Sequence, residues 1–247
     1  MKILEKLKKM FVSFENMLSD EHSCIACSKE IPDGSEFQLC EKCLKNLDEI
    51  DGNICTKCGE KLKDGNMLCD HCKEFDYSFD RNKSICYYTD VSSGIVKSLK
   101  YGGRKYYAKH IAKLMTRDKS CFENVDLITF VPIGKKRLRT RGFNQAEEIA
   151  KEISKLVGIE VVSLLDKVVE KKHQAGLTQK ERLENLKDTF SVCSENKDKI
   201  KGKNILIIDD VFTTGATLSE CSKVLKIQKP KSVSTLTFAK TKFNSIN

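Results

Sequence analysis

The stretch Ile205-Leu-Ile-Ile-Asp-Asp-Val-Phe-Thr-Thr-Gly-Ala-Thr217 decides the fold of this 247-residue chain. Its four leading apolar residues predict a short buried strand, and two acids, Asp209 and Asp210, follow at the carboxyl end of that strand. Ligands of open α/β sheets bind beside the carboxyl ends of the strands. Gly215 permits a close backbone approach, and the N–H groups at the start of a helix expected from about Ala216 favour a phosphate. The stretch therefore predicts a phosphate-binding turn in an α/β protein.

The polar side chains of this turn divide into two groups by charge. The hydroxyls of Thr213, Thr214 and Thr217 can donate hydrogen bonds to phosphate oxygens, whereas carboxylates repel a phosphate and accept hydrogen bonds instead. We therefore expect the two acids to bind a polyol such as ribose, or Mg²⁺. The alternative is a strand that ends in solvated acids, followed by a threonine helix cap.

Strands and helices alternate on both sides of this turn. Residues 95–101, 108–115 and 145–157 have helical spacing of apolar residues, and Gly158 supplies a natural stop for the last of these helices. Residues 127–131, 161–165 and 234–239 are short apolar runs typical of strands. This alternation predicts an α/β fold with a mostly parallel sheet flanked by helices.

Eight of the 12 cysteines form four CxxC pairs near the start of the chain. These cysteines are Cys24, Cys27, Cys40, Cys43, Cys55, Cys58, Cys69 and Cys72. Two residues between thiolates let one tight turn present both sulfurs to a tetrahedral ion, so the pattern predicts two Zn²⁺ sites of four cysteines each. Short loops favour sequential pairing of the knuckles over a cross-braced arrangement. Four thiolates leave no open position for a substrate, so both zinc ions are expected to be structural.

Charge is distributed unevenly along the chain. Residues 1–80 carry 11 Lys and Arg against 17 Asp and Glu, a net charge of −6, whereas residues 81–247 carry 33 against 18, a net charge of +15. The basic part is suited to polyanions, either phosphorylated small molecules or nucleic acid. Charges interrupt every apolar run of residues 1–18, so we expect no signal peptide. No segment approaches the ~18 unbroken apolar residues of a membrane span, so we expect no transmembrane segment and a cytoplasmic protein. Residues 1–18 are expected to form a basic helix that packs on the body of the protein; the alternative is a helix peripheral to the inner face of the membrane.

Residues 135–141, shortly after the strand predicted at 127–131, contain five cations in seven positions. One interpretation is a pyrophosphate loop formed by Pro132, Ile133, Gly134, Lys135, Lys136 and Arg137. A second is a nucleic-acid contact through Lys135, Lys136, Arg137, Arg139 and Arg141, since lysine and arginine bind phosphate backbones without reading sequence. A solvated basic loop is the third.

The turn resembles the 5-phosphoribosyl-1-pyrophosphate fingerprint of type I phosphoribosyltransferases. By that resemblance, Asp209 and Asp210 would bind the ribose hydroxyls, directly or with Mg²⁺. The 5-phosphate would be held by Thr213, Thr214, Gly215, Ala216 and Thr217.

Further segments resemble the ComF family of competence proteins: residues 99–103 (LKYGG), residues 131–145 ending in RGFNQ, and residues 174–190. That family joins an N-terminal double zinc ribbon to a phosphoribosyltransferase domain and is linked to natural transformation, in the handling of incoming single-stranded DNA. One departure is Lys167-Val-Val-Glu-Lys-Lys-His-Gln174, where relatives usually carry an arginine and a threonine; lysine lacks the planar fork of arginine.

The resemblance implies four segments and two functional hypotheses. The segments are an N-terminal helix (1–21), a double zinc ribbon (22–75), a phosphoribosyltransferase-like domain (76–242) and a tail (243–247). In one hypothesis the protein is an active phosphoribosyltransferase with an unknown acceptor. In the other it binds 5-phosphoribosyl-1-pyrophosphate with Mg²⁺ and serves DNA uptake, contacting single-stranded DNA and other competence proteins.

Overall fold

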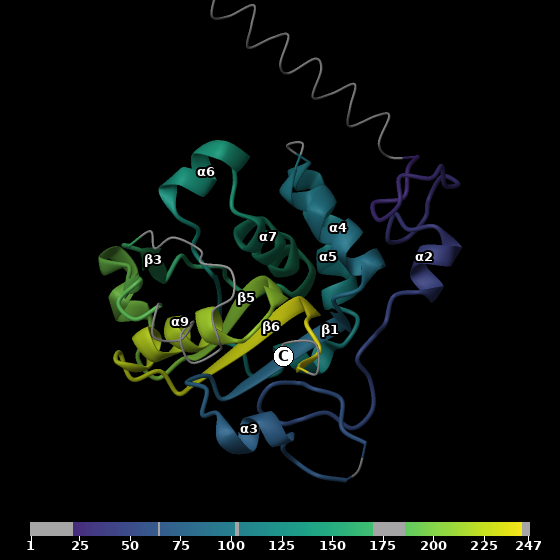
Figure 1. The fold of residues 1–247 in the computed structure, drawn as a ribbon. Coiled ribbons are helices and arrows are strands. Elements are labelled where there is room, and N and C mark those ends of the chain that lie inside the picture. Colours follow the sequence, from purple (N-terminus) through teal and green to yellow (C-terminus); the bar gives the residue numbers. More distant parts are fainter. Residues whose placement is uncertain (1–21, 64, 102–103, 170–185, 244–247) are drawn as a thin grey trace, which may run out of the picture.

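A computed structural model describes residues 22–63, 65–101, 104–169 and 186–243 (Figure 1). The strands are β1 (Arg81–Tyr87), β2 (Leu127–Phe130), β3 (Leu165–Lys167), β4 (Phe190–Val192), β5 (Asn204–Phe212) and β6 (Ser232–Lys240). The α-helices are α2 (Glu41–Lys45), α3 (Asp70–Glu74), α4 (Asp90–Lys100), α5 (Ala108–Met115), α6 (Lys135–Arg141), α7 (Gln145–Val157) and α9 (Ala216–Lys226). Short 3-10 helices are η1 (Lys105–Tyr107), η2 (Lys119–Phe122) and η3 (Ser194–Lys199).

The main sheet has four strands in the order β1-β6-β5-β2, and every neighbouring pair is parallel. Phe130 on β2 pairs with Ile208 on β5, and Ile208 pairs with Leu236 on β6. The carboxyl ends of these strands therefore lie at one edge of the sheet, and the segments that follow β2 and β5 are neighbours there. The strands β3 and β4 form a separate antiparallel pair. The expected mostly parallel α/β fold is confirmed.

Both faces of the main sheet are covered, which explains why β5 begins with an unbroken apolar run. Leu206 and Ile208 pack in one core with residues of α4, α5 and α7, whereas Ile205 and Ile207 pack in a second core with Leu218 of α9 and its helical neighbours. Figure 1 shows α4, α5 and α7 together on one side of the sheet and α9 on the other. Alternate side chains of one strand thus fill two cores.

The helix predicted at residues 145–157 is confirmed, and its ends have clear causes. The side chain of Asn144 accepts a hydrogen bond from the N–H of Ala146 and caps the start of α7. The amide of Asn144 also donates to the carbonyl of Val131, which fixes the start of α7 against the end of β2. Gly158 ends the helix in the left-handed conformation.

The two cysteine-rich segments pack on the α/β body at different places. In the first, Ala26 lies so close to α4 that a Cβ on Gly94 would stand 2.3 Å from the carbonyl oxygen of Ala26. In the second, Asn82 of β1 donates from its backbone N–H to Lys57 and from its side chain to Cys58. The second segment therefore runs along the outer edge of β1 and covers the exposed strand edge.

Several expectations differ from the structure or lie outside it. The basic segment after β2 is a helix, α6, and not a loop. Residues 161–165 form a single bridge, between Val161 and Ile128, and the strand β3 starts only at Leu165. The strand β1 was not expected, because Asn82 and Ser84 interrupt its apolar pattern. The helix expected at residues 1–18 and the last part of the segment Lys167–Gln174 (residues 170–174) lie outside the described residues. None of the helices within the described ranges is both long and apolar enough to span a bilayer.

Candidate functional site

The eight CxxC cysteines gather into two clusters in sequential order. The first zinc ribbon contains Cys24, Cys27, Cys40 and Cys43, and the second contains Cys55, Cys58, Cys69 and Cys72; within each cluster all sulfurs lie within 4.8 Å of one another. A tetrahedral zinc with Zn–S bonds of about 2.3 Å needs sulfurs about 3.8 Å apart. The distance between the sulfurs of Cys27 and Cys40 is 3.8 Å, and between those of Cys58 and Cys69 it is 3.6 Å. Both clusters fit structural zinc, and four sulfurs leave no open coordination position.

The acid pair lies among the last four residues of β5, which continues to Phe212 and does not end at Ile208 as expected. The backbone N–H of Asp210 donates to the Oδ1 atom of Asp209 at 2.9 Å, and the Lys100 ammonium at the end of α4 forms an ion pair with the carboxylate of Asp210. Burial raises the pKa of the Asp209 carboxyl well above its ordinary value, and the negative charge of Asp210 adds to this shift. Two carboxyls so close together need cations to stay ionised, and Lys100 supplies one.

The turn between β5 and α9 has a left-handed glycine at its centre. Gly215 has a φ of 75° and precedes the first residue of α9, and its carbonyl accepts from the N–H of Ser219. Thr213 is exposed and Thr217 is partly exposed, whereas Thr214 is buried and its hydroxyl accepts from the N–H of Ala216 at 3.4 Å. The predicted phosphate turn is thus present as a strand, a left-handed glycine and a helix N-terminus in succession.

Only glycine fits position 215, for two independent reasons. Its positive φ is strained for any residue with a Cβ. A Cβ there would also lie 2.5 Å from Cζ of Phe212 and 2.6 Å from Cε1 of Tyr77. The turn is therefore packed tightly against two aromatic rings, one of which lies beyond the cysteine-rich segment and far from the turn in sequence.

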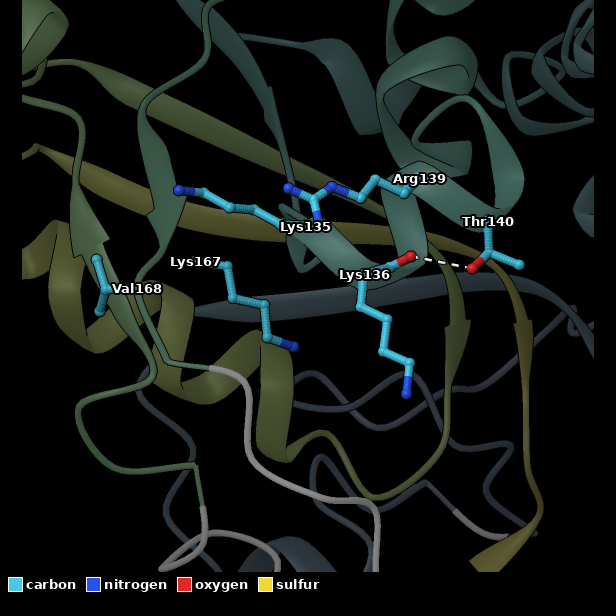
Figure 2. Close-up of a pocket in the computed structure, with 6 residues that line it drawn as sticks. All are labelled: Lys135, Lys136, Arg139, Thr140, Lys167 and Val168. Atoms are coloured by element: carbon cyan, nitrogen blue, oxygen red, sulfur yellow. Dashed lines mark hydrogen bonds between the residues drawn. The ribbon is translucent and has the colours of Figure 1, made fainter.

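A pocket of about 540 Å³ lies beside α6 and is rich in cations (Figure 2). Its lining consists of Lys135, Lys136, Arg139, Thr140, Lys167 and Val168. The first four come from α6, and the last two come from the end of β3 and the residue after it. A concave surface with four cations and one hydroxyl can hold a polyphosphate.

Helical geometry selects which of the basic residues face this pocket. Residues 135, 136, 139 and 140 share one side of α6, because residues three and four apart in a helix are neighbours. Arg137 and Arg141 fall on the opposite side, and the guanidinium of Arg141 donates to the side chain of Gln145. Arg139 therefore replaces Arg137 as the arginine that faces the pocket. All residues of α6 are at least partly exposed.

The acid pair, the turn and the pocket share one edge of the sheet. The N–H of Val131 donates to the carbonyl of Ile208, so the segment leading into α6 starts beside Asp209. Asp209 and Lys167 both lie near enough to the Cys221 thiol in α9 for their charges to shift its pKa. Burial raises the pKa of Cys221, the charge of Asp209 raises it further, and the charge of Lys167 lowers it. The predicted residues that the structure brings together here are therefore those of the turn, the acids and the pocket face of α6.

Three residues of this region were not expected from the sequence. Lys100 pairs with Asp210, Lys167 lines the pocket, and Tyr77 packs on Gly215. The first two are single cations in a chain that contains 44 Lys and Arg, so their number alone cannot single them out. Lys100 does lie within the segment LKYGG, which carried the family resemblance; the glycines of that segment lie outside the described residues.

Comparison with known proteins matches two separate regions of the chain to domain families. The phosphoribosyl transferase domain family matches residues 138–242, and the double zinc ribbon domain family matches residues 20–73. Competence protein F of Haemophilus influenzae is 29% identical over 195 residues, covering 76% of this chain and 84% of that protein. Competence protein ComFC of Bacillus subtilis is 27% identical over 212 residues, covering 81% and 82%. DNA utilization protein YhgH of Salmonella typhimurium is 27% identical over 198 residues, covering 77% and 85%.

The architecture and the similarity lead to one assignment. The two sulfur clusters occupy the matched zinc-ribbon region, and β5, the turn and α9 lie within the matched phosphoribosyltransferase region. The similarity to competence proteins extends over most of the chain and includes both regions. The chain therefore joins a double zinc ribbon to a phosphoribosyltransferase domain, and over most of its length it is similar to competence proteins.

Proposed function

We propose that the protein binds 5-phosphoribosyl-1-pyrophosphate with Mg²⁺ at the carboxyl edge of its parallel sheet. The observation that carries this proposal is the proximity of three features with matching chemistry. These are the acids at the end of β5, the glycine turn before α9 and the cationic pocket beside α6. A sugar with a phosphate at one end and a pyrophosphate at the other needs two anion-binding sites and, between them, acceptors for its hydroxyls.

Each part of the ligand is assigned to groups of matching charge. The 5-phosphate lies at residues 213–217, where backbone N–H groups and the α9 dipole favour an anion. The ribose hydroxyls donate to Asp209 and Asp210. The pyrophosphate lies against Lys135, Lys136 and Arg139, with the backbone of residues 132–134 at the entrance of the helix.

Mg²⁺ fits the chemistry of the acid pair. Carboxylate oxygens are the protein ligands that Mg²⁺ prefers, and it usually binds one or two carboxylates together with substrate oxygens. Burial, and then the negative charge of Asp210, raises the pKa of Asp209 despite the Lys100 ammonium, so a further cation there would favour the ionised acids. When bound, the ion would neutralise the two acids and the pyrophosphate together. The residues that would hold it are Asp209 and Asp210.

Calorimetry with 5-phosphoribosyl-1-pyrophosphate and Mg²⁺ tests this proposal. The wild type is expected to bind, and the Asp209→Asn, Asp210→Asn double variant is expected to lose at least tenfold in affinity. A matched control is Glu195→Gln, Asp198→Asn, which neutralises two exposed acids of η3. The proposal is wrong if the wild type does not bind, or if the acid-pair variant binds as tightly as this control.

We further propose that the protein serves DNA uptake in the cytoplasm and contacts single-stranded DNA through α6. Support comes from the names of its relatives, which include competence proteins and DNA utilization proteins. Support also comes from α6 itself, a fully surface-lying helix with five cations in seven residues. Arg137 and Arg141 are directed away from the pocket side, so they remain accessible to a phosphate backbone while the pocket holds its own ligand. Other competence proteins are the partners expected for such a role.

The salt dependence of DNA binding tests the second proposal. Each phosphate contact to a single strand contributes about 0.7 to the slope of log affinity against log salt concentration. Measured without the pocket ligand, so that all three side chains can reach the strand, the Lys135→Ala, Lys136→Ala, Arg137→Ala variant should therefore reduce that slope by about 2. The matched control is Lys197→Ala, Lys201→Ala, Lys231→Ala, which removes the same charge near the opposite ends of β5 and β6. Equal slopes for the two variants, or no binding at low salt, would contradict a role of α6.

The alternative is an active phosphoribosyltransferase with an unknown acceptor. One observation favours it: the cationic pocket is separate from the phosphate turn and suits a pyrophosphate leaving group. In that reaction the C1–oxygen bond to pyrophosphate breaks with its electron pair on the leaving group, and an acceptor nucleophile forms the new bond to C1. Pyrophosphate release above the rate without acceptor, over a panel of bases and amines, separates this function from binding alone.

A further inference from the structure

The second zinc ribbon is connected to the phosphate turn by two hydrogen bonds in series. The Tyr77 hydroxyl donates to the carbonyl oxygen of Thr214 at 2.8 Å, across 137 positions of sequence. The Nε2 atom of His71 lies 2.8 Å from the same hydroxyl. A hydroxyl has one proton, and a carbonyl can only accept, so His71 must donate to the Tyr77 oxygen from its Nε2–H. His71 therefore donates to Tyr77, and Tyr77 donates to Thr214.

The ribbon end of this connection is held firmly. His71 lies between the zinc-ribbon cysteines Cys69 and Cys72 in α3. Its ring stacks on Phe75 with a centroid distance of 4.7 Å and on Phe243 with a centroid distance of 3.9 Å. Zinc bound by Cys69 and Cys72 would fix the backbone of His71, and the two rings fix its side chain.

A buried lysine ties the same ribbon to β6. Lys240 is completely buried, and its ammonium lies 3.4 Å from the Oε2 atom of Glu60 in the second ribbon. It also lies over the rings of Phe212 and Phe243, at 4.1 Å and 3.9 Å from their centroids. Moving the ribbon would leave a buried charge without its partners, which is strongly unfavourable. The ribbon is therefore a rigid support next to the end of β5.

The turn end of the connection sets the direction of an N–H group. The chain has no cis peptide bond among its described residues, so the carbonyl of Thr214 and the N–H of Gly215 lie antiparallel in one peptide plane. Because the carbonyl points at Tyr77, the Gly215 N–H points to the other side of the turn, away from the aromatic rings. A flip of this peptide would turn the N–H away from an anion at the start of α9. Glycine at position 215 makes such a flip easy, since its backbone is the least restricted.

We propose that Tyr77 is a positioning residue of the phosphate turn, and that the second zinc ribbon holds it in place through His71. The identity of the ligand rests on the function proposed above, whereas the positioning of the turn by Tyr77 does not. The ribbon acts as a clamp that keeps the Gly215 N–H directed at the anion. By linkage, a ligand that needs this orientation also raises the zinc affinity of the second ribbon.

Tyrosine-to-phenylalanine variants test this inference, because they remove a hydroxyl and keep the ring. The test variant is Tyr77→Phe. The control is Tyr87→Phe, whose hydroxyl donates to Glu60 at 2.7 Å and accepts from the N–H of Lys61. Both tyrosines join the second ribbon to the α/β body, but only Tyr77 contacts the turn. A purely structural role would give the two variants the same phenotype.

Hydrogen exchange of the peptide spanning residues 213–218 is measured on the zinc-loaded full chain without ligand. Tyr77→Phe should speed exchange about three- to tenfold, as expected for the loss of one hydrogen bond, whereas Tyr87→Phe should not change it. His71→Phe, which keeps an aromatic ring, should act in the same direction as Tyr77→Phe. Equal exchange in the wild type and in Tyr77→Phe would overturn the inference, whatever the ligand of the site is.

A calorimetric titration with 5-phosphoribosyl-1-pyrophosphate and Mg²⁺ completes the test. We expect Tyr77→Phe to bind several-fold more weakly than Tyr87→Phe, with equal zinc content in both. Equal affinities would also count against the inference. If the wild type does not bind, the proposed function fails, and the exchange measurement still decides whether Tyr77 positions the turn.

Discussion

Replacing Gly215 with alanine tests the packing of the phosphate turn directly. At its φ of 75° a residue with a Cβ is destabilised by about 1–2 kcal/mol. The new Cβ would also stand 2.5 Å from Phe212 and 2.6 Å from Tyr77. These rings are buried and in contact with other aromatic rings, so they cannot move freely, and overpacking of this kind costs about 1–3 kcal/mol. We therefore expect Gly215→Ala to lower the free energy of unfolding by about 2–5 kcal/mol.

Gly158 provides a matched control for this variant. It has the same φ of 75°, yet a Cβ there meets no atom within 4 Å. Gly158→Ala should therefore show the backbone cost alone, about 1–2 kcal/mol. The assay is urea unfolding with zinc present at a constant free concentration, followed by calorimetry with the ligand. Gly215→Ala should also lose at least tenfold in ligand affinity. Equal losses of stability in the two variants would refute the tight packing of the turn on Tyr77 and Phe212.

Three other perturbations have defined outcomes. Lys240→Met should cost about 3 kcal/mol in chemical unfolding, because it leaves the facing ribbon carboxylate unpaired, whereas Lys242→Met at an exposed pair should cost under about 1 kcal/mol. Asp209→Asn should make the protein more stable at neutral pH. The pKa of Asp209 is raised in the folded state, so the wild type is destabilised at neutral pH and regains stability as the pH falls below that pKa. The difference in unfolding free energy between the two proteins should therefore shrink toward pH 4 in pH-dependent unfolding curves. Zinc removal by a chelator should lower the Tm by about 10 °C or more in calorimetric scans, because Cys55 and Cys58 pack in the same core as the sheet; an unchanged Tm would show that the ribbons fold apart from the body.

The parts of the fold that could be predicted from sequence are those with a strong local pattern. A local sequence pattern predicts three of these parts: the strand residues Ile205–Ile208, the glycine of the turn, and the helix Gln145–Val157. The zinc ligands carry theirs in the CxxC spacing. The proposed boundary between ribbon and α/β domain, at residues 75 and 76, stays a prediction. The shared core shows why sequence cannot place it: Tyr77 and Phe79 pack with Cys55 and Cys58.

The missed features depend on contacts between distant segments or on exposed surfaces. The helix α6 has no buried residue, so apolar periodicity, the main signal for a helix, is absent. The strand β1 carries buried polar residues whose partners come from elsewhere, such as Ser84 hydrogen-bonded to Thr237. The contact of Tyr77 with Thr214 joins two segments that lie far apart in the chain. Patterns within a window of sequence contain no information on such pairs.

An experimental structure of the protein with 5-phosphoribosyl-1-pyrophosphate and Mg²⁺ tests the central claim most directly. It should show the 5-phosphate at the N–H groups of residues 213–217 and the ribose hydroxyls on Asp209 and Asp210. The pyrophosphate should lie against Lys135 and Arg139. A ligand bound elsewhere, or a 5-phosphate without contacts to the turn before α9, would contradict the account.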